Sequence, residues 1–438
     1  MRAITRFRRD LKHELRRGLI EARERTLALI APLSHEDLVG QHSRIMSPLV
    51  WDLAHIGYFE ELWLARRIGA FQPLVPEGDD LYDAFEHERS TRAELPLLEP
   101  ERAVAYLAGV RERTLAVLER TDLDPANTLL AGGYVYRLVI QHEHQHIETM
   151  LQTIALRTAG RPYPLPPDVP VPTQPIGEVE VLVQGGPFML GAAHEPWAYD
   201  NELPAEEVDL PPFWIDAVPV TCGAYRDFVE GGGYDDPRWW TPQGWAWRLE
   251  ADLEHPHFWR READGSWSVL RLGRRIPLNP YEPVQHVCWY EADAYARWAG
   301  KRLPTEAEWE KAASWDPAGR KVRYPWGDDA PTPERANLGG RRLGPRPVSS
   351  LPSGESPWGC RQMVGDVWEW TASDFRSYSG FEAFPYSEYS EVFFGSEYKV
   401  LRGGSWATHP VVARATFRNW DLPIRRQIFA GFRCARDA

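Results

Sequence analysis

Residues 133–160, GYVYRLVIQHEHQHIETMLQTIALRTAG, decide the fold of the first part of the chain. Apolar residues recur there at three- and four-residue spacing, which predicts one long amphipathic helix that ends near Gly160. On such a helix His142 and His146 lie one turn apart, so both rings leave the same face. His144 points about 200° away from His142. The pattern favours a shared metal ion at His142 and His146.

The same residues allow two other interpretations. The string at 142–146, HEHQH, satisfies the H-E-x-x-H pattern of zinc proteases, in which Glu143 is the general base. The third ligand of the metzincin spacing is missing, because Thr149 and Gln152 stand there. A solvated polar helix face is the other alternative, but the neighbouring apolar residues indicate a largely buried helix. A zinc hydrolase therefore stays the second interpretation of the metal pattern.

Three further segments before residue 160 have the same helical spacing of apolar residues. They cover residues 5–31, 49–69 and 99–121. Four such helices predict a four-helix bundle over residues 1–160, with 70–99 as a long ordered connection. Ser47 precedes Pro48, which predicts an N-cap followed by proline at the first helical position.

A third histidine, His55, lies on the second of these helices in the string DLAHIG. Metal sites in bundles are built from side chains that project inward from facing helices. His55 facing His142 and His146 would give three neutral imidazoles and leave open coordination positions. Such a set suits iron that binds O2 and substrates together, whereas zinc on the same ligands would activate water. The ligand types alone do not choose between the two metals.

A change of composition marks the domain boundary. Residues 161–175, RPYPLPPDVPVPTQP, contain seven prolines, which predicts a stiff extended linker. Of the 20 tryptophans, 18 follow residue 190, in short apolar runs bounded by Gly and Pro. We therefore expect a second domain over residues 176–438, with few helices and many irregular loops.

Charge, cysteine usage and the distribution of apolar residues argue against several classes of protein. The chain has 438 residues, with 50 Lys and Arg against 63 Asp and Glu, so the net charge of −13 argues against a nucleic-acid binder. The four cysteines form no CxxC pair, which fits a reducing cytoplasm. No run of 18 apolar residues predicts a membrane span, and the basic start lacks the apolar core of a secretory signal. Small molecules are the expected partners.

The second domain contains two expected helices and one charged run that could carry function. Helices are expected at 291–300 and at 305–314, the latter with a capping box of Thr305 and Glu308. The run at 416–427, TFRNWDLPIRRQ, mixes cations, one carboxylate and one amide. A surface salt-bridge cluster is one interpretation of that run. A site for a small zwitterionic ligand is the other.

Several separated motifs resemble a known family. GGPFMLG, PVTCGAYRDF, YPWGD, GDVWEWTAS, RGGSW and GFRCAR are similar to the formylglycine-generating-enzyme fold, a C-type-lectin-like domain. DLAHIGYFEELW and HEHQHIETMLQ resemble a DinB-type bundle. Joined in this order, the two halves resemble the ergothioneine-pathway sulfoxide synthases. The resemblance implies an α+β protein that uses nonheme iron(II) and O2 to form a C–S bond at the imidazole of hercynine. Formylglycine-generating enzymes use a late cysteine pair, but only Cys434 stands near this end, so that activity is not expected.

The resemblance also assigns residues. It implies His55, His142 and His146 as the iron ligands. The Tyr-x-x-Tyr-Ser stretch at 386–390 implies Tyr386 as the catalytic proton donor. The contacts it implies to hercynine are Gln145, Tyr389 and Asn419, and Trp420 lies beside them in the sequence.

The thiol donor of the family is γ-glutamylcysteine, and four charged residues match its contacts: Arg89, Arg92, Asp421 and Arg425. Carboxylates need cations and an amine needs an anion, which explains a basic pocket in an acidic protein. One departure concerns Tyr58 and Phe59, where relatives that use this donor carry two glutamines. The swap is either a neutral change in packing or a changed donor. Aromatic faces suit a sugar ring, and the selenoneine synthase branch of the family takes selenium from a selenosugar, so a C–Se bond is the alternative product.

Overall fold

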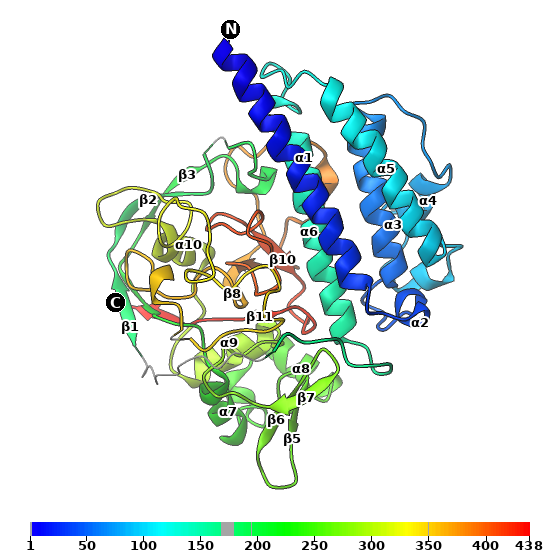
Figure 1. Ribbon diagram of the computed structural model, residues 1–438. Helices are drawn as coiled ribbons and strands as arrows, with labels where there is room; N and C mark the ends of the chain where they lie inside the picture. The colour runs from blue at the N-terminus through cyan, green and yellow to red at the C-terminus, as the bar shows by residue number, and fades with distance from the viewer. Residues whose placement is uncertain (1, 168–178, 194, 349) are drawn as a thin grey trace. The chain divides into compact units, whose positions relative to one another are not determined.

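The computed structural model describes residues 2–167, 179–193, 195–348 and 350–438. The chain divides into two compact units, Met1–Pro164 and Leu165–Ala438, which differ in architecture (Figure 1). The first unit is helical and the second combines short sheets with helices, so the expected α+β class is confirmed. Residues 168–175 of the proline-rich segment lie outside the described residues.

The first unit is built on four long helices, with shorter helical turns in the connections. The long helices are α1 Arg2–Ile30, α3 Leu49–Glu60, α5 Pro100–Arg120 and α6 Tyr134–Ala155. The short ones are α2 His35–Val39, the π-helix η1 Glu61–Arg66, α4 Gly78–Tyr82, and the 3-10 helices η2 Arg89–Glu94 and η3 Ala131–Gly133. Helix α3 packs on both α5 and α6, and α1 packs on α6 (Figure 1).

Burial along the helices explains this arrangement. On α5, Ala103, Leu107, Val110 and Val117 are buried at three-, four- and seven-residue intervals, so one stripe faces the core. Helix α3 differs, because all twelve of its residues are buried. A helix that is covered on all sides is the central element of a bundle, and any polar residue on it requires a partner.

Two details of the sequence prediction are wrong. Ser47 does not cap α3, because the helix starts one residue later and Pro48 occupies the N-cap position without a side-chain cap. The Ser47 hydroxyl instead accepts a hydrogen bond from Arg92 at 2.9 Å. Helix α6 ends at Ala155, short of Gly160, because the chain turns at Leu156 before the glycine is reached.

A network of four buried charges joins the long helices. Arg23 of α1 and Arg111 of α5 each contact both Glu60 of α3 and Glu143 of α6, at N–O distances of 2.7–2.8 Å. The network is buried, and the two carboxylates are 0% and 1% exposed. The two positive and two negative charges balance, so the bundle core carries these ions without a net charge.

The described residues of the second unit form four small sheets. The first has the order β1-β4-β12, from β1 Glu180–Val183, β4 Phe213–Asp216 and β12 Ala435–Asp437, all antiparallel. The second has the order β10-β9-β8-β11, from β10 Asn419–Asp421, β9 Lys399–Arg402, β8 Trp368–Asp374 and β11 Ala430–Gly431. Two separate hairpin sheets are formed by β2 Gly186–Leu190 with β3 Glu206–Leu210, and by β5 Trp259–Arg261, β6 Trp267–Arg271 and β7 Arg274–Pro277.

Four helices accompany these sheets: α7 Cys222–Glu230, α8 Pro242–Glu250, α9 Trp289–Trp298 and α10 Glu306–Ser314. The last two were expected, and the capping box of Thr305 and Glu308 at α10 is confirmed. Helices α7 and α8 were not expected, although Thr221 and Thr241 cap them by accepting a backbone N–H. The remaining short elements are the 3-10 helices η4 Asp200–Glu202, η5 Pro237–Trp239, η6 Pro352–Gly354, η7 Ser387–Tyr389 and η8 Glu391–Phe393.

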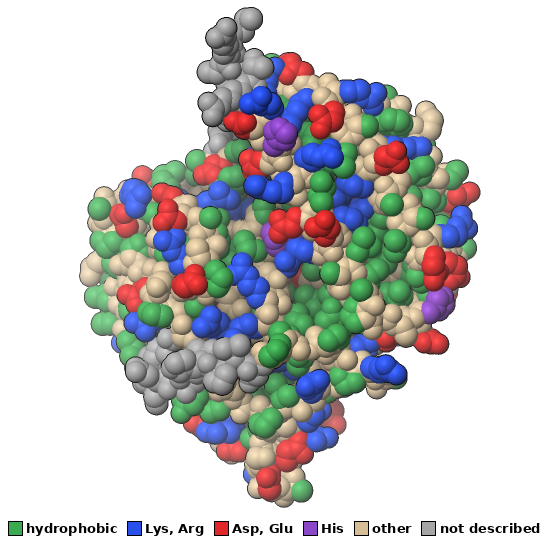
Figure 2. Space-filling model, in the orientation of Figure 1, with side chains coloured by type: hydrophobic (Ala, Val, Ile, Leu, Met, Phe, Trp, Pro, Cys, Tyr) green, Lys and Arg blue, Asp and Glu red, His purple; other side chains and the backbone are tan. Residues whose placement is uncertain are grey.

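Charged side chains of both signs lie on the surface shown in Figure 2. On the face shown in Figure 2, Lys and Arg side chains are interspersed with Asp and Glu, and no broad basic face is visible. Among the described residues, no helix is long and apolar enough to cross a membrane.

Candidate functional site

The structure brings together the three histidines that the sequence selected. His55 of α3 faces His142 and His146 of α6, and one ligand nitrogen from each lies within 4.8 Å of the others. The Nε2 atoms of His55 and His142 are 3.2 Å apart. His55 is buried, while His142 and His146 are partly exposed. The cluster is therefore backed by the bundle and open on one side.

Aromatic rings and outer hydrogen bonds fix the orientation of the imidazoles. The Nδ1 of His55 lies 2.7 Å from the carbonyl oxygen of Tyr82, which leaves its Nε2 for the cluster. Trp51 stacks on His55 at 4.7 Å between ring centroids, and Phe59 stacks on His142 at 3.7 Å. Trp51, His55 and Phe59 follow one another at intervals of four residues, so one face of α3 carries the stacking rings and the ligand.

Electrostatics favours neutral rings in this cluster. Burial, helped by the neighbouring imidazole of His146, lowers the pKa values of His55 and His142 well below their usual range. Neutral imidazoles are the form that binds a metal ion. Three imidazole nitrogens that converge, with one open side, fit a transition-metal ion such as iron or zinc.

His144 does not join the cluster. It is 2% exposed, and burial lowers its pKa to about 3. Its position agrees with the helix geometry, which turns the ring away from His142. Gln145, the residue assigned to hercynine, is half-buried on the same helix.

Glu143 is unsuited to act as a general base. Arg23 and Arg111 donate to its two carboxylate oxygens, and Thr26 donates to one of them at 2.9 Å. Burial alone would raise the pKa of Glu143, but these two arginines outweigh it and hold the pKa below its ordinary value. The H-E-x-x-H match therefore has a structural glutamate in the place where a zinc hydrolase needs a free base.

Arg89 and Arg92 lie on η2, in different environments. Arg89 is exposed, and its Nη1 donates to the Ile45 carbonyl at 3.3 Å. Arg92 is 4% exposed, lies 3.6 Å above the ring of Trp51, and donates to backbone carbonyls and to Ser47. Burial and the nearby charge of Arg89 lower the pKa of Arg92 to about 10. Two adjacent cations favour the binding of an anion.

Tyr58 and Phe59 are packed within the bundle. Tyr58 is 5% exposed and belongs to an apolar cluster with Trp51 and Tyr82, and its hydroxyl reaches Asp83 at 3.4 Å. Phe59 is 6% exposed and covers His142. Packing within the bundle therefore explains why aromatic residues stand at both positions.

In the second unit, the middle of the Tyr-x-x-Tyr-Ser stretch forms the 3-10 turn η7, Ser387–Tyr389, and Tyr386 occupies its N-cap position. The rings of Tyr386 and Tyr389 are perpendicular, with centroids 6.2 Å apart. Tyr389 also stacks on Tyr199 at 4.5 Å and meets Trp420 of β10 edge-on at 6.0 Å. Tyr386, Tyr389 and Trp420 are all half-buried. The structure therefore places three of the selected residues in one aromatic group.

Two polar residues of η4 hold this turn from both ends. The Asp200 carboxylate accepts from the backbone N–H of Phe384 at 3.2 Å and from the Ser390 hydroxyl at 2.5 Å. The amide of Asn201 donates to the same hydroxyl at 3.0 Å. Burial raises the pKa of Asp200 to about 6. Residues 384–390, which include Tyr386 and Tyr389, are thus fixed at their two ends.

The charged run at 416–427 serves two purposes. Asn419, Trp420 and Asp421 form β10, and Arg425 lies 3.5 Å from Asp421 in a partly exposed pair. Arg418 is instead buried and paired with Glu306, and Arg426, which is half-buried, is paired with the buried Glu291. The interpretation of the whole run as one ligand site is too broad, because these two cations support the fold.

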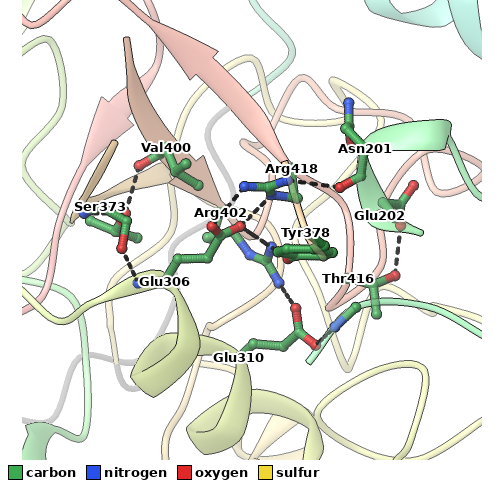
Figure 3. A network of polar contacts seen from close by, with 12 residues as sticks. Asn201, Glu202, Glu306, Glu310, Ser373, Tyr378, Val400, Arg402, Thr416 and Arg418 are labelled. Atoms are coloured by element: carbon green, nitrogen blue, oxygen red, sulfur yellow. Dashed lines mark hydrogen bonds and ion pairs between the residues drawn. The ribbon is translucent and has the colours of Figure 1, made fainter. Parts of the chain in front are cut away.

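Arg418 belongs to the buried network of Figure 3. Glu306 and Glu310 of α10 contact Arg402 of β9, and Glu306 also binds Arg418. Arg418 donates at 2.8 Å to the carbonyl of Asn201, the residue that helps hold η7. Through Arg418, the network therefore connects the start of β10 to η4.

One tight turn of the RGGSW motif requires glycine. Gly403 has φ of +90°, and a Cβ there would lie 2.4 Å from the Met363 carbonyl oxygen. Gly403 follows directly after Arg402, so the turn positions the end of β9.

Sequence analysis missed the residues that hold the site residues in place. The Oδ1 of Asp52 lies 3.0 Å from the Nδ1 of His146. The sequence contained a clue to this contact, because Asp52 is a charged residue on a helix that is otherwise mostly apolar. The sequence contained no such clue for Asp200 and Asn201, since they lie more than 180 residues before the turn that they contact.

Comparisons with known proteins agree with this division into two units. Residues 19–150 match the DinB superfamily, and residues 168–438 match the sulfatase-modifying factor enzyme 1-like domain. A formylglycine-generating enzyme of Streptomyces coelicolor is 36% identical and covers 59% of this chain and 89% of its own.

Full-length relatives are more similar. The hercynine oxygenase of Mycolicibacterium smegmatis is 51% identical over 427 residues, which is 95% of this chain and 97% of the relative. The hercynine oxygenase of Mycobacterium tuberculosis is 50% identical and covers 96% of this chain and 97% of its own. Both units are therefore matched together, in the same order.

Proposed function

The chain belongs to the hercynine oxygenases, oxygen-dependent oxidoreductases, and we propose that it joins hercynine to γ-glutamylcysteine and yields a sulfoxide. The observation that carries the proposal is the convergence of His55, His142 and His146. Iron(II) at these three nitrogens would supply the redox chemistry that O2 requires.

The proposed reaction balances without an external reductant. The C–H bond of the imidazole and the S–H bond of the donor are broken, and a C–S bond and an S=O bond are formed. These two oxidations release four electrons, which reduce one O2 to the sulfoxide oxygen and one water. The two protons of the water come from the broken C–H and S–H bonds.

The aromatic group of the second unit is the proposed site for the trimethylammonium group of hercynine. Cations bind to the faces of tyrosine and tryptophan rings, and cages of such rings recognise quaternary ammonium groups. Tyr389 and Trp420 are perpendicular and half-buried, as in such a cage. Asn419 next to Trp420 would add a hydrogen bond, and the resemblance also assigns Gln145 to this substrate.

Tyr386 is the proposed proton donor. Its ring meets Tyr389 edge-on, so its hydroxyl belongs to the same aromatic group. The hold of Asp200 and Asn201 on residues 384–390 limits the movement of this hydroxyl. A phenol that is held in place can donate the proton of its Oη during the reduction of O2.

The charged residues are the proposed contacts of the donor. Arg89 and Arg92 would bind one carboxylate of γ-glutamylcysteine, Arg425 would bind the other, and Asp421 would bind its amine. The selenosugar alternative depends on ring surface at Tyr58 and Phe59. Because both rings are packed, we favour the thiol donor over the selenosugar.

An aerobic assay with the iron-loaded full chain tests this proposal. With hercynine and γ-glutamylcysteine, we expect one O2 consumed for each sulfoxide formed. Arg89→Ala should raise the KM for the donor about tenfold or more, because a charge-assisted hydrogen bond is lost. Arg120→Ala removes an exposed arginine of α5 as the matched control and should leave the KM unchanged. O2 consumption without a product that contains hercynine would contradict the proposal.

A further inference from the structure

We propose that Asp52 is a positioning residue that orients His146 and places the negative charge of a carboxylate beside the three-histidine cluster. The inference rests on the proposed function only in that the cluster holds a metal ion. It adds a residue outside the ligand set and assigns to it a measurable effect on metal affinity.

A single hydrogen bond connects Asp52 to the cluster. Asp52 lies in the first turn of α3 and is 2% exposed. Its Oδ1 is 3.0 Å from the Nδ1 of His146 on α6, so the contact joins two helices. When Nδ1–H donates to a carboxylate, the lone pair of His146 lies on Nε2, and the ring is held in one orientation.

His55 shows the contrasting case. Its Nδ1 also has an outer partner, but that partner is the neutral carbonyl oxygen of Tyr82, at 2.7 Å. The two ligands are therefore oriented in the same manner by groups of different charge. An ionised partner makes the imidazole more basic and strengthens its bond to a cation, which a carbonyl does to a smaller extent.

The burial of Asp52 supports a role beyond helix stability. Its second oxygen, Oδ2, has no hydrogen-bond partner among the described residues. Arg92 is close enough to interact with it electrostatically, but no hydrogen bond joins the two in the described part of the chain. A carboxylate buried with one of its oxygens unbonded is costly, and a metal ion of charge +2 at the cluster would offset that cost.

An acidic residue in the first turn of a helix also interacts favourably with the helix dipole. That purely structural role would change the stability of the protein to the same extent with and without metal. A positioning role predicts something different, namely a change in metal affinity and in the potential of bound iron while the apoprotein stays folded.

The test is a titration of the full-length apoprotein with Co(II), followed by the d–d absorption bands. Asp52→Asn keeps the size of the side chain and an oxygen that can accept from Nδ1–H, but removes the charge. Asp52→Ala removes both. We expect the affinity for Co(II) to fall about 10- to 100-fold in Asp52→Ala and less in Asp52→Asn, with the band positions kept in Asp52→Asn.

Asp37→Asn is the matched control. Asp37 is also a buried carboxylate of the first unit, but it pairs with Arg157 in place of a histidine. This variant should bind Co(II) like the wild type. In the iron-loaded protein, Asp52→Asn should raise the midpoint potential, because Fe(III) gains more than Fe(II) from a nearby negative charge.

The outcomes separate the inference from the proposed function. If the wild type binds Co(II) and both Asp52 variants bind it equally well, the inference is overturned and the histidine site stands. If the wild type binds no Co(II), the metal assignment and the inference both fall. If Asp52→Ala does not fold, the affinity and potential of Asp52→Asn decide the question.

Discussion

The two groups of candidate site residues differ in how the chain holds them in place. In the helical unit, the period of α3 and α6 places His55, His142 and His146, and the fully buried helix α3 lies behind them. In the second unit, Tyr386 directly precedes the short 3-10 turn η7, and Trp420 lies in a three-residue strand. Regular helices therefore preform the metal site, whereas the aromatic group depends on distant polar contacts.

This difference has a consequence for the effects of substitutions. A ligand on a rigid helix can be removed without moving its neighbours, so the loss should be specific to the metal. A residue on a turn is fixed by its partners, so the removal of a partner such as Asp200 should weaken the function of a residue that it does not contact.

Removal of a ligand should have the largest effect. His55→Ala and His146→Ala should each lose the bound iron, because two imidazoles retain a metal far less well than three. His144→Ala, on the same helix, should keep it. Metal analysis of the purified proteins measures this directly. Equal loss in all three variants would show that the assignment of helix faces is wrong.

The next effect concerns the proton donor of the second unit. Tyr386→Phe keeps the ring and removes the hydroxyl, so iron and substrates should still bind. The rate of coupled product formation should fall about 10²- to 10⁴-fold, the range for the loss of a general acid. The ratio of product to O2 consumed is the measurement, and Tyr281→Phe, an exposed tyrosine, is the control. Unchanged coupling would move the proton donor to another residue.

A third prediction concerns the charges that join the four helices. Arg111→Met leaves Glu60 and Glu143 with one cation, so the protein should lose about 3–5 kcal/mol of stability. Denaturant unfolding checks this value, with the half-buried Arg113→Met as the control.

A substitution in the same network tests whether Glu143 is a structural residue or the general base of a zinc hydrolase. Glu143→Gln should lower the stability and leave the iron site intact, because Glu143 is bound by Arg23 and Arg111. A variant with wild-type stability but no turnover would favour a general base at Glu143 and hence the zinc alternative.

The smallest predicted effect is a pH dependence of the second unit. Burial raises the pKa values of Asp200 and Asp366 from 3.8 to about 6. Between these pH values the folded state binds more protons than the unfolded state, so stability falls as the pH rises from about 4 to about 6 and then levels off. Asp200→Asn should flatten this slope in unfolding curves, and the exposed Asp329→Asn should not. If the slope of stability against pH is unchanged in Asp200→Asn, the raised pKa of the buried Asp200 carboxyl is contradicted.

The sequence predicted the parts of the fold that depend on local period. The long helices and the proximity of His142 to His146 follow from the 3.6-residue repeat, and the cap of α10 follows from Thr305 and Glu308. The hold of Asp200 on Ser390 joins residues 190 positions apart, and no local pattern encodes such a pair.

The interpretation of charged residues was the least complete. The sequence does not distinguish Arg418, which is buried in an ion pair, from Arg425, which is partly exposed. The role of Arg92 is similarly hard to predict from the sequence, because the residue is buried over Trp51 and also lies close to Arg89. Burial depends on the packing of the whole unit, which single residues do not reveal.

The most direct test of the proposed activity is a competition in air. The iron-loaded wild type is given hercynine with equal amounts of γ-glutamylcysteine and a selenosugar, and the product is identified by mass spectrometry. We predict a sulfoxide that joins hercynine to the sulfur of the peptide. A product that contains mainly selenium would contradict the assignment of the donor. No coupled product from either donor, with the iron site filled, would contradict the proposed reaction itself.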